Sequence, residues 1–290
     1  MLTRINFLTA GESHGRGLLG IIDGIPSGLE INKKYIDVQL KRRQMGHGRG
    51  GRMKIENDAV EIWSGIRDGK TIASPIGLIV KNKDWKNWKN KMSVEKMGKT
   101  PRKVTLPRPG HADLAGVEKY GFDDIRNVLE RSSARETTMR VALASVCRKL
   151  LGDIGIHVAS RVVQIDDIVD SSSIPSNFKI QKLNQLADKS PVRCLNGNIE
   201  KEMIQVIDHA KSQGDSVGGV FEVIATGMAH GLGSYTQWNK KLQAKITSLM
   251  MSVNAYKAIE IGSGFNSGAK FGSEIHDEID WNGKTKVASL

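Results

Sequence analysis

The order of the apolar runs is the feature that most constrains how this chain can fold. Short β-branched runs flanked by glycine or proline predict strands at Ile5–Thr9, Leu18–Ile22, Ala59–Trp63, Ile76–Val80, Val158–Ile165 and Val220–Ala225. Helical spacing of apolar residues predicts helices after an Asn32 N-cap and over Thr137–Leu151, Glu202–Ser212 and Lys241–Val253. The two kinds of element mix without the regular βαβ alternation of a doubly wound sheet.

Composition excludes several classes of protein. With 39% hydrophobic residues over 290 positions, the chain can bury a large core and is unlike a disordered protein. No run of about 18 apolar residues occurs, so no transmembrane helix is expected. A fold stabilised mainly by disulfides is excluded, because the chain has only two cysteines. The amino terminus lacks the apolar stretch of a secretory signal, which predicts a cytoplasmic protein. One domain, or two closely packed halves, is expected because there is no repeat or proline-rich linker.

The net charge of +12 is concentrated in two windows. Lys33–Lys54 and Lys81–Lys103 each have a net charge of +7, and the other 245 residues sum to −2. Such an excess indicates an acidic partner. The second window interleaves Trp85 and Trp88 with lysines, which suits stacking on single-stranded nucleic acid. A solvated loop whose tryptophans fold back onto the protein is an equal alternative.

Two histidines are predicted on rigid corners. His14 lies in the turn Gly11–Gly15, where two glycines permit a tight bend that exposes polar side chains. His111 follows Pro109 and Gly110, which fix a turn directly before it. A histidine in such a turn is a structural hydrogen-bonding group more often than a catalyst, but both side chains are suited to acid–base chemistry.

Arginine-rich segments accompany these corners. In Arg42–Arg52, glycines separate the arginines, so several guanidinium groups can converge on one anion. The alternative is an Arg-Gly-rich surface loop that binds RNA. In Glu130–Arg140, arginines flank small hydroxyl residues at a predicted helix start, an arrangement that favours phosphate binding. A capping box explains that helix start but not its three arginines. The motifs together predict acid–base chemistry on a strongly anionic small molecule.

The sequence lacks the motifs of several other kinds of site. No pair of histidines or cysteines has zinc-ligand spacing, so no metal is predicted. The glycine loops of dinucleotide-binding and Walker-type proteins are absent from the sequence. The nucleophile elbow of serine hydrolases is also absent.

Four motifs together closely resemble those of the chorismate synthase family. They are Gly11–Gly15, Arg42–Arg49, Arg108–Asp113 with Lys119 and Tyr120, and Arg131–Thr137. The resemblance extends through Asp215–Gly219, Ser252–Lys257 and Gly262–Phe265, and so spans essentially the whole chain. The arginine-glycine segment and the segment around Trp85 are similar to the branch found in Gram-positive-type bacteria.

The resemblance implies an α+β fold, a β-α-β sandwich assembled as a homotetramer. It implies 1,4-elimination of phosphate from 5-enolpyruvylshikimate 3-phosphate to give chorismate, the last step of the shikimate pathway. Reduced FMN is implied as the cofactor, without net redox change, and NADPH is a candidate reductant. A substrate with one phosphate and two carboxylates fits the arginine-rich segments.

The resemblance also assigns residues. His14 matches the acid that protonates the reduced flavin, and His111 matches the group that protonates or stabilises the departing phosphate. Arg43 and Arg49 match positions for substrate or NADP, and Arg108, Arg135 and Arg49 are further candidates for the substrate's anionic groups. The FMN-contacting positions are matched by Arg131, Ser132, Ser133, Asn254 and Ala255.

Family members continue beyond the segment that matches Gly272–Ile279. We therefore expect residues 1–290 to form a single domain of this type that lacks the C-terminal part of the family. Two alternatives to an active enzyme stay open. The chain is an inactive truncated relative that does not bind flavin, or it is a basic protein that binds single-stranded nucleic acid.

Overall fold

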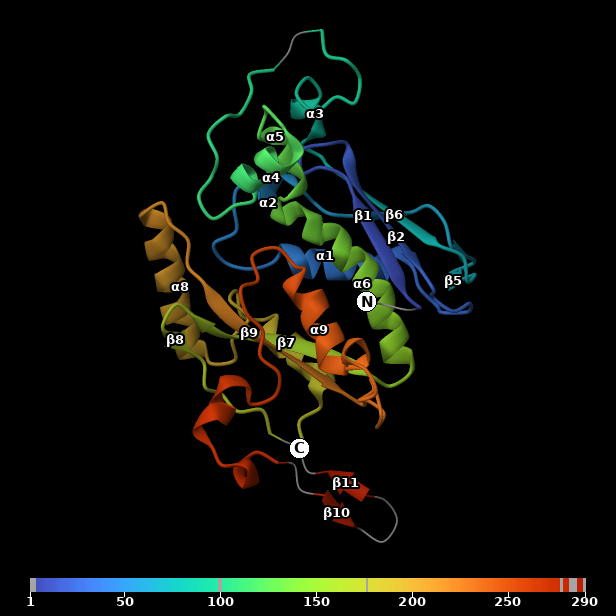
Figure 1. Ribbon diagram of the computed structural model, residues 1–290, viewed down its shortest axis with the longest axis vertical. Helices are drawn as coiled ribbons and strands as arrows, with labels where there is room; N and C mark the ends of the chain where they lie inside the picture. The colour runs from blue at the N-terminus through green and yellow to red at the C-terminus, as the bar shows by residue number, and fades with distance from the viewer. Residues whose placement is uncertain (1–3, 99–100, 176, 277–278, 282–285, 289–290) are drawn as a thin grey trace. The chain divides into compact units, whose positions relative to one another are not determined.

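The computed structural model describes residues 4–98, 101–175, 177–276, 279–281 and 286–288 (Figure 1). The chain divides into two compact units, one that runs to His230 and one that begins at Gly231. The strands are β1 (Asn6–Ala10), β2 (Gly17–Asp23), β3 (Val60–Ile62), β4 (Ile66–Arg67), β5 (Lys70–Thr71), β6 (Ile76–Lys81), β7 (His157–Ile165), β8 (Ile168–Val169), β9 (Gly219–Thr226), β10 (Ile279–Trp281) and β11 (Lys286–Ala288). The helices are α1 (Lys33–Gln44), α2 (Arg52–Ile55), α3 (Trp85–Trp88), α4 (Asp113–Tyr120), α5 (Arg126–Arg131), α6 (Thr137–Asp153), α7 (Leu183–Ala187), α8 (Gly197–Ser212) and α9 (Leu242–Met251).

The first sheet has the strand order β1-β2-β6-β3, with antiparallel neighbours throughout. Side chains alternate between the two faces of a strand. In β2, Leu18 and Ile22 are buried while Leu19 and Ile21 are exposed. The sheet therefore has one apolar face that must be covered, because burying such a face supplies much of the stability of a fold.

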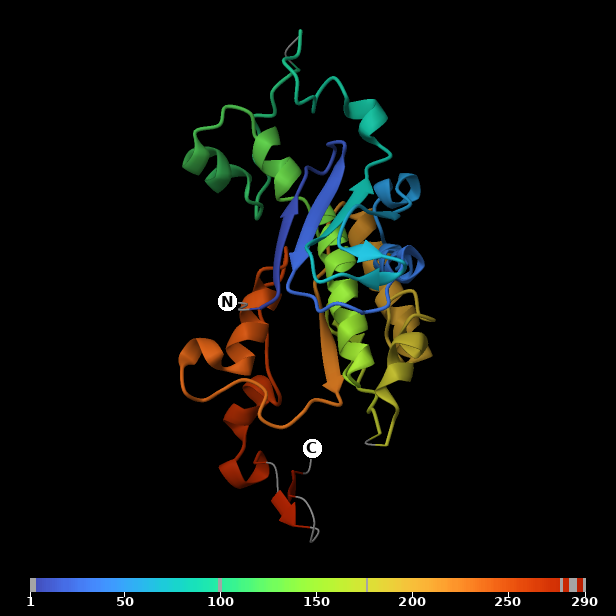
Figure 2. The ribbon, with the colours of Figure 1, turned by 90° about the vertical axis from the view of Figure 1, so that its right-hand side faces the viewer.

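Helices α1 and α6 cover that apolar face (Figure 2). The Asn32 side chain accepts the Tyr35 N–H at 3.0 Å, so it caps α1, and Ile36 and Leu40 are completely buried. Helix α6 packs Met139 directly over Gly20 of β2, where an added Cβ would lie 2.6 Å from the Met139 side chain. A glycine in the strand thus lets the helix approach the sheet closely.

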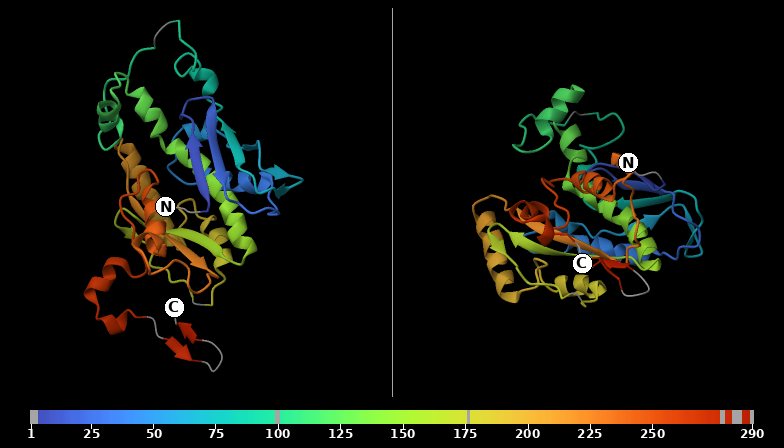
Figure 3. Two further views of the ribbon diagram at one scale, coloured as in Figure 1. Left: turned by 45° about the vertical axis from the view of Figure 1, so that its right-hand side comes forward. Right: turned by 60° about the horizontal axis from the view of Figure 1, so that its bottom comes forward.

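The second sheet has the order β8-β7-β9 and is also antiparallel. Its core contains Ala159, Leu183 and Met203, contributed by β7, α7 and α8. Helix α6 contacts β2 and β6 of the first sheet and β7 of the second, so helices lie between the two sheets (Figure 3). This α+β fold is a β-α-β sandwich, as predicted.

The elements expected from the sequence are present. Each of the six predicted strands is confirmed within one residue at either end. The largest difference is α8, which begins at Gly197 rather than Glu202 because the Asn196 side chain caps it, accepting the Asn198 N–H at 2.9 Å. Cys147 packs against the core in the way a small apolar residue does, and burial raises the pKa of its thiol.

The unit that begins at Gly231 contains α9 and several short 3-10 turns. Asn254 and Ala255 follow α9, and Ala255 adopts a left-handed backbone conformation with φ of 70°. A non-glycine residue in that region is strained, and such strain is concentrated at functional sites. Among the described helices, none combines the length and apolar character needed to cross a membrane.

Candidate active site

The turn that bears His14 follows β1 and is anchored at both ends. Gly11 has φ of 100°, and an added Cβ would lie 2.4 Å from the carbonyl oxygen of Gly17, so only glycine fits. The Ser13 N–H donates to the carbonyl oxygen of Glu130 at 3.0 Å. The predicted tight turn is confirmed, and it lies against the end of α5.

Glu130 holds the imidazole of His14. Its side chain is completely buried, its Oε1 lies 2.9 Å from His14 Nδ1, and its Oε2 accepts the His14 backbone N–H at 2.7 Å. A carboxylate only accepts hydrogen bonds when ionised, so the Nδ1 atom bears the hydrogen. The opposite ring atom, Nε2, is then the one left for chemistry.

Arg52 approaches that free nitrogen from α2. Its Nη1 lies 3.2 Å from His14 Nε2 and 2.5 Å from Ser13 Oγ. A guanidinium group only donates, so Nε2 accepts, which agrees with the tautomer set by Glu130. His14 therefore lies between a buried carboxylate and an arginine.

A network of charged and polar side chains, the ion-pair framework, contacts this turn. It consists of Arg43, Arg135, Glu56, Asp58 and Asn82. Arg135 is nearly fully buried, with Nη1 at 2.6 Å from Asp58 Oδ1 and Nε at 3.0 Å from Asn82 Oδ1. Asn82 in turn donates to the carbonyl oxygens of Glu12 and Gly15, on either side of His14. The framework thus fixes both ends of the histidine turn.

Arg43 lies at the edge of this framework. It donates to Thr137 Oγ1 and to the Ala134 carbonyl oxygen, each at 3.1 Å. Burial lowers the pKa of Arg43 to about 10; Asp58 opposes this shift, and Arg135, Arg49 and Arg52 add to it. Crowding of cations around one side chain favours an anion that would relieve their repulsion.

Three buried guanidinium nitrogens have no hydrogen-bond partner within the described part of the chain. They are Nε of Arg52, Nε of Arg126 and Nη2 of Arg135. A buried donor without an acceptor costs free energy. Arg135 Nη2 still lies 3.6 Å from Glu56 Oε2. The unmatched donors suit an anionic ligand with several oxygens.

The second basic window contributes one aromatic ring to the site. Trp88 of α3 stacks on His14 with ring centroids 3.9 Å apart and planes 22° apart. Its Nε1 donates to Asp84 Oδ2 at 3.0 Å. Hydrogen bonds from Asn87 and Trp88, with the nearby His14 and Arg52, lower the pKa of Asp84 against the effect of its burial. Trp88 therefore folds back onto the protein, and the nucleic-acid alternative loses this stacking surface.

The His111 corner is held by its own turn. His111 Nδ1 lies 2.6 Å from Asp113 Oδ1, and Arg108 Nε donates to Asp113 Oδ2 at 2.9 Å. The hydrogen bond from Arg108 is the main reason that the pKa of buried Asp113 lies well below its usual range. Asp113 raises the pKa of Arg108, and Glu130 adds to that rise, so this corner lies within electrostatic range of the carboxylate that holds His14.

The residues predicted to contact FMN divide between the two units. Arg131 donates to the carbonyl oxygens of Thr9 at 2.8 Å and Gly11 at 3.3 Å. Ser133 Oγ donates to Ser13 Oγ at 3.1 Å, and Ser132 Oγ donates to the Val128 carbonyl oxygen at 2.8 Å. These three residues thus lie beside the His14 turn. Asn254 and Ala255 belong to the unit that begins at Gly231.

The remaining predicted arginines take different positions. Arg49 donates from Nε to the Met45 carbonyl oxygen at 3.0 Å and lines a separate cavity of about 800 Å³ with residues of β7, β9 and α8. Arg135, a candidate for the substrate's anions, is engaged by the buried carboxylates of the framework. Within the described ranges, no group of three His, Cys, Asp or Glu side chains is placed to share a metal ion.

A model of the chorismate synthase family matches residues 5–288. The chain belongs to the chorismate synthase family. A relative named chorismate synthase from Listeria welshimeri is 50% identical over 281 residues, which are 96% of this chain and 72% of the relative. One from Enterococcus faecalis is 51% identical over 284 residues, 97% of this chain and 73% of the relative. A solved structure described as "Crystal Structure of Chorismate Synthase" has a TM-score of 0.83 and 39% identity, and the match covers 99% of this chain and 78% of that one.

Membership of the chorismate synthase family defines the reaction. The chain is a lyase that eliminates phosphate from 5-enolpyruvylshikimate 3-phosphate and forms chorismate, in the shikimate pathway of aromatic amino acid biosynthesis. The substrate is a phosphorylated small molecule, and the family needs reduced flavin. The nucleic-acid and inactive-relative alternatives receive no support from these matches.

Sequence reasoning missed four residues of this candidate site: Glu130, Arg52, Trp88 and Asn82. Glu130 precedes the predicted FMN stretch, and Arg52 ends the predicted arginine segment, so both lay inside motifs without a role of their own. Trp88 lay in a window with two open interpretations. Asn82 had no signal in the sequence, because its role depends on contacts with a turn 67 to 70 residues away.

Proposed function

We propose that the phosphate-elimination chemistry takes place at the cluster formed by His14, Arg52, Glu130 and the ion-pair framework. The observation that supports this most is the geometry of His14: Nδ1 lies 2.9 Å from a buried carboxylate, and Nε2 faces an arginine at 3.2 Å. Proton transfer needs a group held in one tautomer and orientation. An anionic substrate needs nearby donors that water does not occupy.

We also propose that reduced FMN is the flavin and that it binds at the Arg131–Ser133 segment. The residues present fit a phosphate-bearing group, because buried nitrogens of Arg52 and Arg126 lack acceptors among the described residues and lie in the same cluster. Arg131, Ser132 and Ser133 would hold the cofactor there, and Asn254 and Ala255 are separate candidates for a flavin contact in the unit that begins at Gly231. Bound there, reduced FMN would supply an electron that the substrate returns after phosphate has left, so that no net redox change results. Arg43 and Arg49 are proposed for substrate or for NADPH as reductant.

In this proposal His14 holds the transferable proton at Nε2. Glu130 orients the ring for this transfer, because its carboxylate lies 2.9 Å from Nδ1 and leaves Nε2 as the reacting atom. Arg52 donates to Nε2 in the structure described here. An anionic oxygen of the substrate is a stronger acceptor than a neutral imidazole, so substrate binding draws Arg52 away and frees Nε2.

His111 is proposed to stabilise the departing phosphate. Asp113 accepts from Nδ1 at 2.6 Å and orients the ring, so Nε2 of His111 is the atom that faces a ligand. Arg108 Nη2 lies 3.1 Å from the His111 ring nitrogens, and Arg108 adds a positive charge beside the leaving group. A guanidinium beside an oriented imidazole suits a phosphate that gains charge as its bond breaks.

The test is chorismate formation from 5-enolpyruvylshikimate 3-phosphate with chemically reduced FMN, under anaerobic conditions. His14→Ala and His111→Ala are each expected to lower kcat/KM by about 100-fold or more, as removal of a general acid does. His157→Ala, on β7 of the second sheet, is the matched control and should retain the wild-type rate. A wild-type rate in both site variants would overturn the assignment.

Cofactor binding is tested separately by titrating FMN under reducing conditions with substrate present. Arg131→Ala should weaken flavin binding by about tenfold, the loss of a charged hydrogen-bond donor. Unchanged affinity would contradict the proposed flavin segment. We further propose a cytoplasmic homotetramer, to be tested by the mass of the purified chain in solution; a monomer would reject the assembly.

A further inference from the structure

The lysine-rich segment around α3 is connected to the His14 turn at its base. The Asn82 side chain donates to the Glu12 carbonyl oxygen at 3.1 Å and the Gly15 carbonyl oxygen at 2.9 Å. Glu56 Oε2 accepts the Lys83 backbone N–H at 2.9 Å. The first residues of the segment are therefore fixed by buried side chains that also belong to the ion-pair framework.

Helix α3 then directs one side chain into the site. Trp88 stacks on His14 with centroids 3.9 Å apart, and its Nε1 donates to Asp84, four residues earlier, at 3.0 Å. Lys91 Nζ lies 4.9 Å and Arg126 Cζ 5.6 Å from the indole centroid, which is within the range of cation–π attraction. Stacking, a hydrogen bond and two cations together hold the indole in one orientation.

We propose that Trp88 is a positioning residue for His14, and that the segment Asn82–Lys91 is built to place this indole against the imidazole. This inference rests on the proposed role of His14. Glu130 fixes the ring through Nδ1 and thus restricts its translation. Once Arg52 has been drawn to the substrate, as proposed above, the hydrogen bond to Glu130 alone leaves rotation of the ring about that bond, and the flat indole face blocks it. Nε2 is then aimed at one point.

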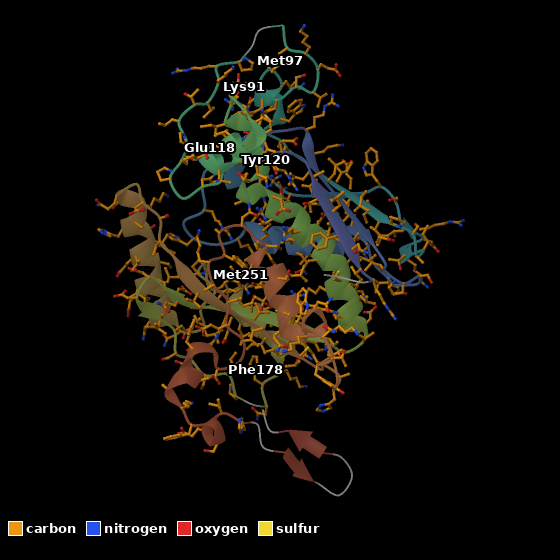
Figure 4. All side chains as sticks on the ribbon, viewed as in Figure 1. Lys91, Met97, Glu118, Tyr120, Phe178 and Met251 are labelled. Atoms are coloured by element: carbon orange, nitrogen blue, oxygen red, sulfur yellow. The ribbon has the colours of Figure 1, made fainter. Side chains whose placement is uncertain are left out.

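Charge adds a second effect. The face of an indole ring bears partial negative charge and attracts a cation. It therefore attracts Lys91 and Arg126, and it supplies no acceptor that competes for Nε2 of His14. Exposed lysines such as Lys91, labelled with Met97 in Figure 4, follow α3 in the same segment. They explain why this window is basic, since it lies beside a site for a phosphorylated substrate.

Three substitutions test the proposal. Trp88→Leu removes the aromatic face, Trp88→Phe keeps a face but loses the hydrogen bond to Asp84, and Trp85→Leu is the matched control on the same helix. The direct readout is the proton NMR shift of the His14 ring, because a stacked indole shields the ring protons. His14 is identified in histidine-labelled protein as the signal missing from His14→Gln.

The expected result is a downfield shift of the His14 ring signals in Trp88→Leu, small changes in Trp88→Phe, and none in Trp85→Leu. Kinetically, kcat of Trp88→Leu should fall about tenfold while KM changes less than about twofold, because misorientation affects the reacting state more than binding. Phenylalanine should restore kcat to within about threefold of the wild type.

Unshifted His14 signals in Trp88→Leu, or an unchanged kcat, would overturn the proposal. If the leucine variant does not fold, Trp88→Phe decides, because loss of the shielding in a folded protein that keeps an aromatic ring contradicts the stack. Wild-type turnover of His14→Ala instead rejects the proposed function. In that case the NMR comparison still reports whether Trp88 holds the ring.

Discussion

The two histidine corners of this enzyme are built in opposite ways. His14 is held by residues far away in the sequence, with Glu130 116 positions later and Arg52 38 positions later. His111 is held by Arg108 and Asp113, both within three positions. The first corner therefore exists only when the chain has folded, whereas the second is defined by a short local turn.

This difference determines how each corner responds to substitution. The His14 corner depends on buried ion pairs, and a change in any of them leaves an unpaired charge in the interior. The His111 corner depends on charges that are partly exposed, apart from buried Asp113, so its interactions are screened by solvent. Substitutions at the first corner should affect folding and activity together, and those at the second should have smaller effects on the free energy of unfolding.

The largest expected effect is a loss of stability when the ion-pair framework that contacts the His14 turn is broken. Arg135→Met removes one cationic partner of two buried carboxylates, Glu56 and Asp58, and should lower the free energy of unfolding by about 3 to 5 kcal/mol. Urea denaturation measures it. Lys149→Met, which breaks a surface pair with Asp153 on α6, is the control and should cost less than about 1 kcal/mol. Equal costs would mean that the framework is not essential to this corner.

A smaller but specific effect is expected at Glu130. Glu130→Gln keeps the size of the side chain but loses the charge beside His14 Nδ1, so kcat should fall about 100-fold. Steady-state kinetics with reduced FMN gives the value. Glu118→Gln is the matched control on exposed α4, labelled in Figure 4, and should behave as the wild type. A kcat within about twofold of the wild type in Glu130→Gln would argue against a buried carboxylate as the support of His14.

The smallest expected effect is at the His111 corner and depends on pH. The pKa of Asp113 lies below its unfolded value of about 3.9, so its carboxylate stabilises the fold above about pH 4, and this contribution fades as the pH falls toward the folded pKa. Asp113→Asn should therefore cost about 1 to 2 kcal/mol near pH 7. The difference from the wild type should shrink below about pH 4, as measured by denaturation at a series of pH values. A difference that stays constant down to about pH 2 would contradict this linkage.

The same contrast explains what the sequence could predict. The strands, the capped start of α1 and both histidine turns follow from local patterns, and the structure confirms them. Glu130 could not be assigned, because its partner is 116 residues away and no local pattern links the two. The sequence left two interpretations of Trp88 open, stacking on nucleic acid and folding back onto the protein. Only its packing against His14 distinguishes them.

Arginine roles were the hardest to separate from sequence. Arg43, Arg49, Arg52 and Arg135 lie in motifs of similar composition, yet Arg135 is buried with carboxylates while Arg49 lines a separate cavity. Burial depends on which residues pack above each side chain, and this is set by the whole fold. The motif predicts a cluster of cations but not which of them face a ligand.

A double-mutant cycle between His14 and Glu130 tests the central claim most directly. If Glu130 acts through His14, Glu130→Gln should cost about 100-fold in kcat/KM in the wild-type background and less than about twofold in the His14→Ala background. Independent losses that multiply in the double variant would contradict the claim, because Glu130 would then contribute without the histidine it holds.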